Sequence, residues 1–296
     1  MAADLSLSSA DLTVTLLDPA VDRSRLGPRF CAGGYIWQIT DRSGRALLSG
    51  PEGPAPAPSP FNGHGLPESF RDRTRDGRPL TWRGERGLAP GAGILGRAPS
   101  GGPVIVVEPC AWTISGDTTR RSFRTAQVLA DQSYTLERTV SITGRRVTSS
   151  TIFGNAGDAP LDLQWFAHPF FALGADHTLT ATLPPGTQLP ANPGFSFDAT
   201  DATLRFTRPF VGVDDGQFEL FTLPPDHTLE TRLSHPAIED GIRFATSFVP
   251  SECPVWANGH TFSIEPYQGL HLAPGETRRW TLTYDFGGPS APISRG

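Results

Sequence analysis

The chain has 296 residues, with 25 basic and 30 acidic side chains and a formal net charge of −5 at pH 7. The basic residues are scattered and mixed with acids, so we expect no nucleic-acid partner. All 25 basic residues are arginines. The absence of lysine excludes Schiff-base catalysis and a lysine-dependent phosphate loop, because both need an ammonium group.

Three cysteines, Cys31, Cys110 and Cys253, lie far apart in the sequence. Their odd number and wide spacing predict buried, reduced thiols and indicate neither a disulfide framework nor a metal site. The N-terminus has no basic segment followed by an apolar one, and no apolar run approaches the length of a membrane span. We therefore expect a soluble, cytoplasmic protein with no membrane partner.

Short apolar runs separated by glycine- and proline-containing turns are typical of an all-β protein. In the first half of the chain, such runs predict strands at residues 11–17, 35–40, 104–107, 122–130, 133–140, 146–153 and 161–166. The run at 104–107 is apolar throughout, so we expect it to be covered on both faces. Ahead of the second strand, Gly33 and Gly34 predict a sharp turn or a close approach of the backbone.

The second half repeats this pattern, with strands predicted at residues 179–183, 202–206, 218–223, 241–249, 262–264 and 279–286. Proline interrupts nearly every window that could form a helix. The number of strands is too large for one small sandwich and fits two large sheets packed face to face. We predict a large antiparallel β-sandwich, with residues 1–296 forming one domain.

Residues 49–60 are rich in Pro, Gly, Ala and Ser, a composition that predicts a loop. The segment that follows, residues 61–71, is polar and glycine-rich with aromatic ends. This composition favours a segment that lines a cleft, with the side chains of His64 and Arg71 facing the ligand. A solvated surface loop in which these two side chains have no role is the alternative.

The first candidate for chemistry is Glu265, which follows the predicted strand at 262–264. Pro266 cannot donate a ladder hydrogen bond and Gly269 permits an unusual backbone angle, so we expect the strand to stop just after the carboxylate. Apolar neighbours would raise the pKa of Glu265 and make it a usable general base near neutral pH. A solvated glutamate beside a turn is the alternative.

The second candidate, His168, follows the predicted strand at 161–166 and precedes Pro169. A histidine and a glutamate opposed across a cleft can act as acid and base without extreme changes in pKa. Aromatic side chains near both candidates could offer flat platforms to the C–H face of a sugar ring. These are Trp165, Phe166, Phe170, Tyr267 and Trp256. A core histidine hydrogen-bonded to the backbone is the alternative for His168.

Other common sites find no support in the sequence. The remaining histidines are dispersed without metal-ligand spacing, and no G-x-S-x-G elbow occurs. The run at residues 91–96 satisfies G-x-G-x-x-G but lacks a preceding strand and a following helix, so we give it no weight.

Three stretches together resemble the aldose 1-epimerases, the galactose mutarotase-like proteins. Phe262-Ser-Ile-Glu265-Pro-Tyr-Gln-Gly269, followed by Leu272-Ala-Pro-Gly-Glu276 and a closing strand at 280–284, is similar to the C-terminal signature of that family. Residues 155–172 resemble the segment that carries its catalytic histidine. Residues 64–71 resemble its "H-G-F-x-R" loop but contain extra residues, so either Arg71 or Arg73 could fill the arginine role.

The resemblance implies the large antiparallel supersandwich fold and the interconversion of the α and β anomers of an aldose. Glu265 would take the proton of the anomeric hydroxyl while His168 donates one to the ring oxygen, which needs no metal or other cofactor. The family also places an aspartate on a sugar hydroxyl. Asp214 and Asp215 occupy a comparable position, with Asp215 slightly favoured, and a β-turn is the alternative. The implied substrate-binding residues are His64, Arg71, Asp215, Phe170 and Tyr267.

Three other functions stay open. A hexose-6-phosphate 1-epimerase would need a cationic cluster, for which Arg71, Arg73, Arg75 and Arg78 offer material. A sugar-binding or sensing protein could keep the cleft without turnover, although the presence of both His168 and Glu265 argues against it. A polysaccharide lyase or hydrolase would need a tyrosine base or a second carboxylate near Glu265. In each case we expect the ligand to be a saccharide, and for the epimerases a monosaccharide. We expect the protein itself to be a monomer or a homodimer.

Overall fold

The computed structural model describes residues 5–53, 58–71, 74, 76, 80–98 and 101–287. Within these ranges the regular structure is 24 β-strands and one 3-10 helix, Arg23–Arg25. Neighbouring strands pair antiparallel throughout. None of the described residues form a helix long and apolar enough to cross a membrane. The all-β prediction is confirmed.

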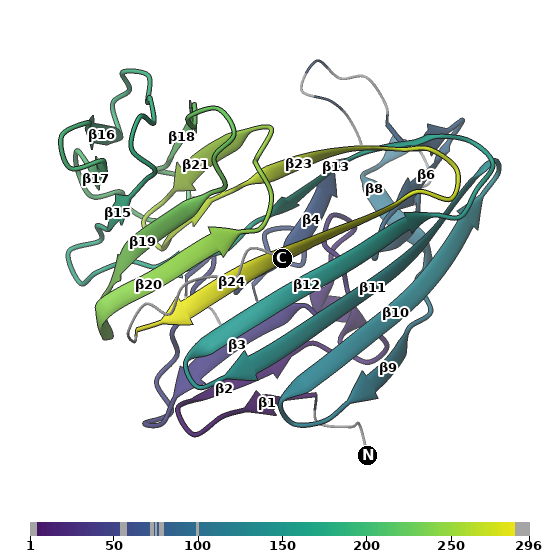
Figure 1. Cartoon of the computed structure of the whole chain (residues 1–296), viewed down its shortest axis with the longest axis horizontal. Helices are drawn as coiled ribbons and strands as arrows, with labels where there is room; N and C mark the ends of the chain where they lie inside the picture. The colour runs from purple at the N-terminus through teal and green to yellow at the C-terminus, as the bar shows by residue number, and fades with distance from the viewer. Residues whose placement is uncertain are drawn as a thin grey trace.

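The largest sheet contains ten strands and extends across the molecule (Figure 1). Its centre is formed by the strands predicted at residues 122–130, 133–140 and 146–153, which the C-terminal strand joins to the remaining strands. In spatial order the strands are β16 (Phe195–Asp198), β17 (Thr203–Phe206), β15 (Thr180–Thr182), β19 (Glu230–His235), β20 (Ile238–Thr246), β24 (Thr277–Phe286), β12 (Arg146–Asn155), β11 (Gln132–Thr143), β10 (Arg120–Leu129) and β9 (Thr113–Gly116).

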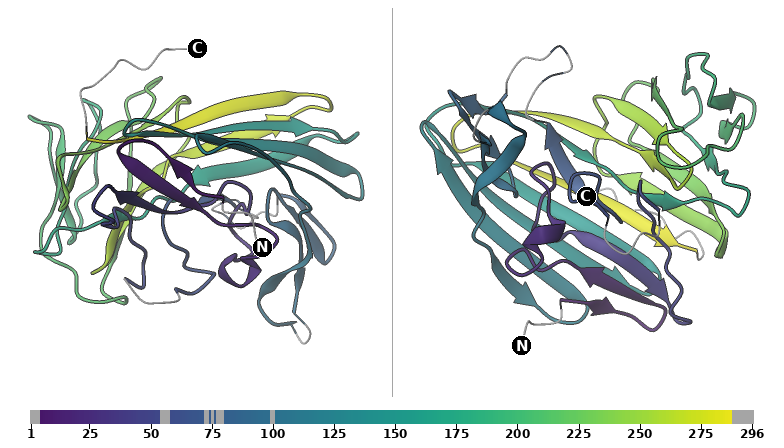
Figure 2. Two further views of the ribbon diagram at one scale, coloured as in Figure 1. Left: turned by 90° about the horizontal axis from the view of Figure 1, so that it is seen from below. Right: turned by 180° about the vertical axis from the view of Figure 1, so that it is seen from behind.

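Four smaller sheets complete the sandwich, and the N-terminal one lies beneath the large sheet in Figure 2, left. It contains β1 (Leu7–Ser8), β2 (Leu12–Leu16) and β3 (Ile36–Asp41). A second contains β23 (Tyr267–Leu272), β13 (Leu161–Ala167) and β4 (Glu68–Arg71). The third contains β14 (Phe171–Ala172), β22 (Thr261–Ile264), β21 (Cys253–Ala257) and β18 (Gln217–Phe221). The fourth contains β5 (Trp82–Arg83), β6 (Arg86–Ala89), β7 (Gly93–Arg97) and β8 (Val104–Pro109).

The hydrophobic core lies between these layers. One cluster of buried side chains draws on residues from Leu5 to Phe286. Within it, Trp165 of β13 meets Trp280 of β24 edge to face, with 5.5 Å between ring centroids. Because burial of large aromatic surface dominates core energetics, this contact holds the β23-β13-β4 sheet against the large sheet. The predicted large antiparallel β-sandwich is confirmed.

A buried ion pair also joins the layers. Arg138 of β11 donates from Nη2 to Glu68 Oε1 of β4 at 2.6 Å, and neither side chain is more than 1% exposed. Ser149 Oγ donates to the same oxygen at 2.6 Å, and Trp165 Nε1 donates to Oε2 at 2.8 Å. A buried charge that loses its partner costs several kcal/mol, so these bonds fix the position of β4.

Most of the predicted strands are confirmed, but the expected burial of residues 104–107 is wrong. They belong to β8, which pairs on one side only, with β7. Ile105 is 38% exposed and Val107 43% exposed. Apolar composition predicted a strand correctly here, but the strand lies at the edge of a small sheet and leaves side chains uncovered.

Two glycine predictions had different outcomes. Gly34 has a φ of +70°, and a Cβ on Gly33 would lie 2.3 Å from the Trp112 ring, so the predicted turn and close approach are both confirmed. Gly269 lies inside β23 and outside the left-handed region. Strand β22 ends at Ile264, one residue earlier than predicted, and the chain resumes strand pairing directly after Pro266.

Candidate active site

His168 and Glu265 come together because their strands pair in register. Phe166 of β13 lies opposite Tyr267 of β23 in an antiparallel ladder. The ladder ends at this pair, and its register places His168, two residues beyond Phe166, on the level of Glu265, two residues before Tyr267. The backbone N–H of His168 donates to the Pro67 carbonyl oxygen at 2.9 Å, which ties the histidine to the segment before β4.

The two side chains are in direct contact. His168 Nδ1 lies 3.3 Å from Glu265 Oε1 and 3.0 Å from Ser263 Oγ. His168 is 8% exposed and Glu265 6% exposed. His168 Nε2 makes no hydrogen bond with any residue that the structure describes. The sequence-based expectation that the two groups face each other across a cleft is therefore wrong in its geometry: they lie side by side.

Burial favours the neutral form of both groups. It raises the pKa of Glu265 from its ordinary value of 4.5 to about 7, against the opposing effects of Arg29, a Ser263 hydrogen bond, Arg71 and a Tyr267 hydrogen bond. Burial, with a smaller contribution from Arg29, holds the pKa of His168 well below its usual range. Between these pKa values Glu265 is protonated and His168 is neutral, so the pair carries no net charge.

Aromatic rings surround the pair. The His168 ring centroid lies 4.5 Å from Phe170, 5.8 Å from Phe166 and 6.5 Å from Trp256. Tyr267 stacks on Phe166 at 4.3 Å with an interplanar angle of 9°. The predicted aromatic residues are therefore gathered at one place, with the exception of Trp165. Its side chain points from the opposite face of β13 into the core.

Two arginines flank the pair. Arg71 of β4 has its guanidinium carbon 5.5 Å from the Tyr267 ring centroid. Arg29 has its guanidinium carbon 5.0 Å from the Phe30 ring, and Phe30 lies 6.5 Å from the His168 ring. Arg29 was not predicted. Arg73, Arg75 and Arg78, which the sequence offered as further cations, lie outside the described residues.

His64 lies beside this group on the segment that leads into β4. Its ring contacts Trp37 at 4.8 Å between centroids, and its Nε2 lies 3.2 Å from Gln38 Nε2. Burial, with the positive charge of Arg25, lowers the pKa of His64 to about 4. The next residue, Gly65, accepts a hydrogen bond from the Phe170 N–H at 2.8 Å, which connects the segment to the His168 turn. A substrate-binding role for His64 stays a prediction.

Asp215 is held by a different part of the chain. Both of its carboxylate oxygens accept 2.7 Å hydrogen bonds from Arg208, and one also accepts from the Val211 N–H at 2.9 Å. Within the described residues, its contacts do not connect it with His168 or Glu265. The proposed role of Asp215, or of its neighbour Asp214, on a sugar hydroxyl stays a prediction.

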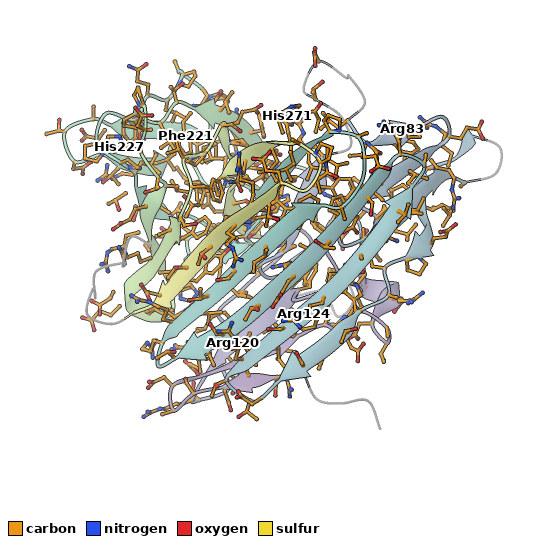
Figure 3. All side chains as sticks on the ribbon, turned by 45° about the vertical axis from the view of Figure 1, so that its right-hand side comes forward. Arg83, Arg120, Arg124, Phe221, His227 and His271 are labelled. Carbon is orange, nitrogen blue, oxygen red and sulfur yellow. The ribbon has the colours of Figure 1, made fainter. Side chains whose placement is uncertain are left out.

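No group of three or more metal-ligating side chains is found in the described part of the chain. Two of the dispersed histidines, His227 and His271, are well separated at the surface in Figure 3. A pocket of about 370 Å³ adjoins Phe30 and is lined also by Pro60 and Trp112. Neither His168 nor Glu265 lines it, so we do not place the reacting group of a substrate there.

Sequence reasoning missed two residues of the site. Ser263 had a usable signal, because residues two apart in a strand share one face and Ser263 precedes Glu265 by two. Arg29 had none. It lies in an irregular segment beside β4, where its carbonyl oxygen accepts a 2.6 Å hydrogen bond from Ser69 Oγ, and only tertiary structure brings it to the pair.

The fold and this site define an all-β protein with a candidate acid–base pair where strands β13 and β22 end. The fold is galactose mutarotase-like, as comparison with solved structures shows. A galactose mutarotase related enzyme from Lactobacillus acidophilus superposes with a TM-score of 0.58 at 10% identity, covering 97% of this chain and 98% of that one. A galactose mutarotase-like protein from Lactobacillus casei gives 0.58 at 12% identity, with coverages of 95% and 99%.

A third similar structure is a protein from Escherichia coli K12 that is provisionally assigned as an aldose 1-epimerase. It has a TM-score of 0.53 at 14% identity and covers 95% of this chain and 97% of that one. No protein-family model and no curated protein sequence matches this chain. The family resemblance drawn from the sequence is thus supported at the level of the fold.

Proposed function

We propose that this protein is an isomerase of the aldose 1-epimerase type, which interconverts the α and β anomers of a free or modified hexose. The observation that carries the proposal is the 3.3 Å contact between His168 Nδ1 and Glu265 Oε1. The anomeric hydroxyl and the ring oxygen of a sugar are bonded to the same carbon atom. A carboxyl and an imidazole that lie side by side can therefore reach one oxygen each.

Ring opening then proceeds as a proton relay. The anomeric hydroxyl gives its proton to the free oxygen of Glu265, Glu265 Oε1 passes its own proton to His168 Nδ1, and His168 Nε2 donates to the ring oxygen. The bond between the anomeric carbon and the ring oxygen breaks, and the open-chain aldehyde forms. Rotation about the bond between C1 and C2 and reversal of the relay close the ring as the other anomer.

The surroundings of the pair favour such a relay. Burial raises the pKa of Glu265 and lowers that of His168, so the resting pair is a carboxylic acid and a neutral imidazole. In the relay both groups stay neutral, because each gains one proton and loses one. Glu265 thus acts as base toward the hydroxyl and His168 as acid toward the ring oxygen, and no charge has to develop in a nearly dry site.

The test is anomer exchange measured by NMR or polarimetry with freshly dissolved α-glucose and α-galactose. Each positioned proton transfer contributes on the order of 100- to 10,000-fold, so Glu265→Gln and His168→Asn should each slow exchange by about that factor. The matched control is His271→Asn, an imidazole that is 73% exposed and paired with Asp162 (Figure 3). It should leave the rate unchanged.

Two results would contradict the proposal. Wild-type protein that accelerates no aldose but binds one would identify a sugar-binding protein. Variants at both positions that fold normally and retain full exchange rates would remove the pair from the mechanism.

A further inference from the structure

The edge of strand β8 forms one wall of the pocket of about 370 Å³ beside Phe30. This wall consists of three consecutive residues, Val104, Ile105 and Val106. Successive side chains of a strand point to opposite faces, so a pocket that touches three consecutive residues lies alongside the strand, at its backbone edge. Within the described residues β8 pairs only with β7, so its other edge is open to the pocket.

The hydrogen-bonding pattern shows which backbone groups this open edge presents. At the start of the ladder between β7 and β8, the Ala98 N–H donates to the Pro103 carbonyl oxygen at 3.0 Å. Because hydrogen-bonded and non-hydrogen-bonded pairs alternate along an antiparallel ladder, Ile105 directs its N–H and C=O toward β7. The N–H and C=O of Val104 and Val106 point to the other side, where no residue of the described chain pairs with them. These two residues therefore form a short template for a further strand.

The open stretch lacks the features that usually protect a strand edge, which are charged side chains, prolines and bulges. In β8 these features lie on either side of it: Pro103 comes before, and a register shift and Glu108 come after. Gln127 Nε2 donates to the Glu108 carbonyl oxygen at 3.3 Å, which closes the edge at that end. Residues 104–106 themselves are only valine and isoleucine. Their edge is thus suited to accept another strand.

The remaining walls of the pocket are mostly apolar and are held in place. They include Leu26, Pro28, Phe30, Pro60 and Trp112. Phe30 forms an antiparallel bridge with Ser69 of β4, which fixes one wall. Trp112 packs against Gly33 so closely that a Cβ on Gly33 would lie 2.3 Å from the Trp112 ring. The volume lies within the range of about 300–1,000 Å³ that is typical of ligand pockets, and walls held in this way need little rearrangement to bind.

We propose that this pocket binds an extended peptide of a partner protein, which adds to β8 as a further strand. The peptide backbone pairs with Val104 and Val106, and one apolar side chain of the peptide enters the pocket beside Phe30. Arg23 is the charged residue among the described residues that line the pocket, and it is exposed and forms no ion pair with any of them. An acidic residue of the peptide pairs with Arg23.

The same features favour a single extended chain over other occupants. A small apolar molecule could fill the pocket but could not pair with N–H and C=O groups spaced two residues apart along a strand. A second copy would have to present its own β8 edge, and in that copy Leu26 and Pro28 line the same pocket in front of the edge. An isolated peptide carries no such wall. The inference does not depend on the proposed function, because neither His168 nor Glu265 lines the pocket.

The test uses three terminally blocked hexapeptides, acetyl-Asp-Thr-X-Thr-Val-Thr-amide, in which X is Val, Leu or Phe. Isothermal titration calorimetry measures binding, and amide hydrogen exchange followed by NMR locates it. In the free protein we expect the Val104 and Val106 amide protons to exchange fast and the Ile105 amide proton to exchange slowly. At least one peptide should bind and slow exchange at Val104 and Val106 by about 10-fold or more.

Two N-methylated forms of the peptide that binds provide an internal control. Alternate amides of an added strand face β8, and the amides between them face away. Methylation of the first set removes the donors to β8 and should weaken binding by about 10-fold or more, whereas methylation of the second set should have little effect.

Variants of the protein test each part of the site. Val106→Pro removes the outward N–H and keeps the bonds of Ile105 to β7, so it should weaken binding by about 2- to 10-fold, whereas Val106→Thr should retain it. Arg23→Gln should weaken binding by about 2- to 5-fold, and only for peptides that contain aspartate rather than asparagine. Val249→Ser alters a valine that is 48% exposed outside this pocket and should change nothing. Thermal unfolding shows that each variant is folded.

Four results would overturn the inference. The first is that none of the three peptides binds at about 1 mM. The second is that both methylated forms bind as well as the parent peptide, which would identify an apolar pocket alone. The third is full affinity in folded Val106→Pro. The fourth is protection of the Val104 and Val106 amides that needs no peptide and rises with protein concentration, which would identify a second copy as the occupant.

Discussion

Replacing Glu265 by glutamine should change how the stability of the protein depends on pH. Burial raises the pKa of Glu265 from 4.5 to about 7, so between these values the folded state holds a proton that the unfolded state has released. The stability from this proton is complete below pH 4.5 and is lost as the pH rises through about 7. At about 1.36 kcal/mol for each pH unit between the two pKa values, the loss amounts to about 3 kcal/mol.

Glutamine has nearly the shape of the protonated carboxyl and does not ionise. We therefore expect the free energies of unfolding of wild type and Glu265→Gln to be similar near pH 4.5 and to diverge as the pH rises. By pH 8 the variant should be more stable than the wild type by about 3 kcal/mol, a gain at the cost of activity. Urea unfolding followed by tryptophan fluorescence at several pH values between 5 and 8 measures both curves.

A difference that stays constant within about 1 kcal/mol over this range would refute the reasoning, because Glu265 would then titrate alike in both states. His168 acts in the opposite direction: burial lowers its pKa, so its contribution is lost as the pH falls below 6.5. Repeating the comparison in a His168→Asn background removes that titration and should leave the difference in place.

Three further predictions concern activity and the core. The rate constant kcat/KM for anomerisation should fall above pH 7, where Glu265 loses its proton, and fall again in acid as His168 gains one; NMR exchange between pH 4 and 9 measures this profile. Tyr267→Phe removes a hydrogen bond that lowers the pKa of Glu265, so the alkaline limb of the same profile should move to higher pH. Glu68→Gln and Arg138→Met should each cost about 3–5 kcal/mol in urea unfolding, and the double variant should cost less than their sum.

The strands of the fold were predictable because alternation and turn residues are local signals. The runs at 122–130, 133–140 and 146–153 appear as β10, β11 and β12, with the turns where the sequence places them. β21 was missed because Pro254 interrupts a short run, although it pairs there with Leu220. The exposure of residues 104–107 was missed because a strand's own sequence does not state whether a second neighbour covers it.

The site was predictable in part for the same reason. His168 and Glu265 stand out because each follows a strand and precedes a proline, and both features are local. Their side-by-side contact depends on the register between β13 and β23, which no single stretch encodes. Arg29 belongs to the site only through its place beside β4, some 236 positions before Glu265 in the sequence. Non-local pairing of this kind leaves no periodic signal to read.

Two buried glutamates in this fold show how surroundings decide what a carboxyl group does. Glu68 and Glu265 are similar in sequence, since each is adjacent to a proline at a strand boundary: Glu68 begins β4 and Glu265 follows β22. Fixed donors on Arg138, Ser149 and Trp165 bind both oxygens of Glu68, so moving a proton there would break a bonded network.

Glu265 instead contacts an imidazole that can exchange a proton with it. A carboxyl group held in this way can change its protonation state without disturbing the core. The ion pair at Glu68 is close to this arrangement along the chain, because Glu68 lies opposite Ala167, the residue directly before His168. Under the proposed function, stability and proton transfer thus depend on different carboxylates, Glu68 in β4 and Glu265 between β22 and β23.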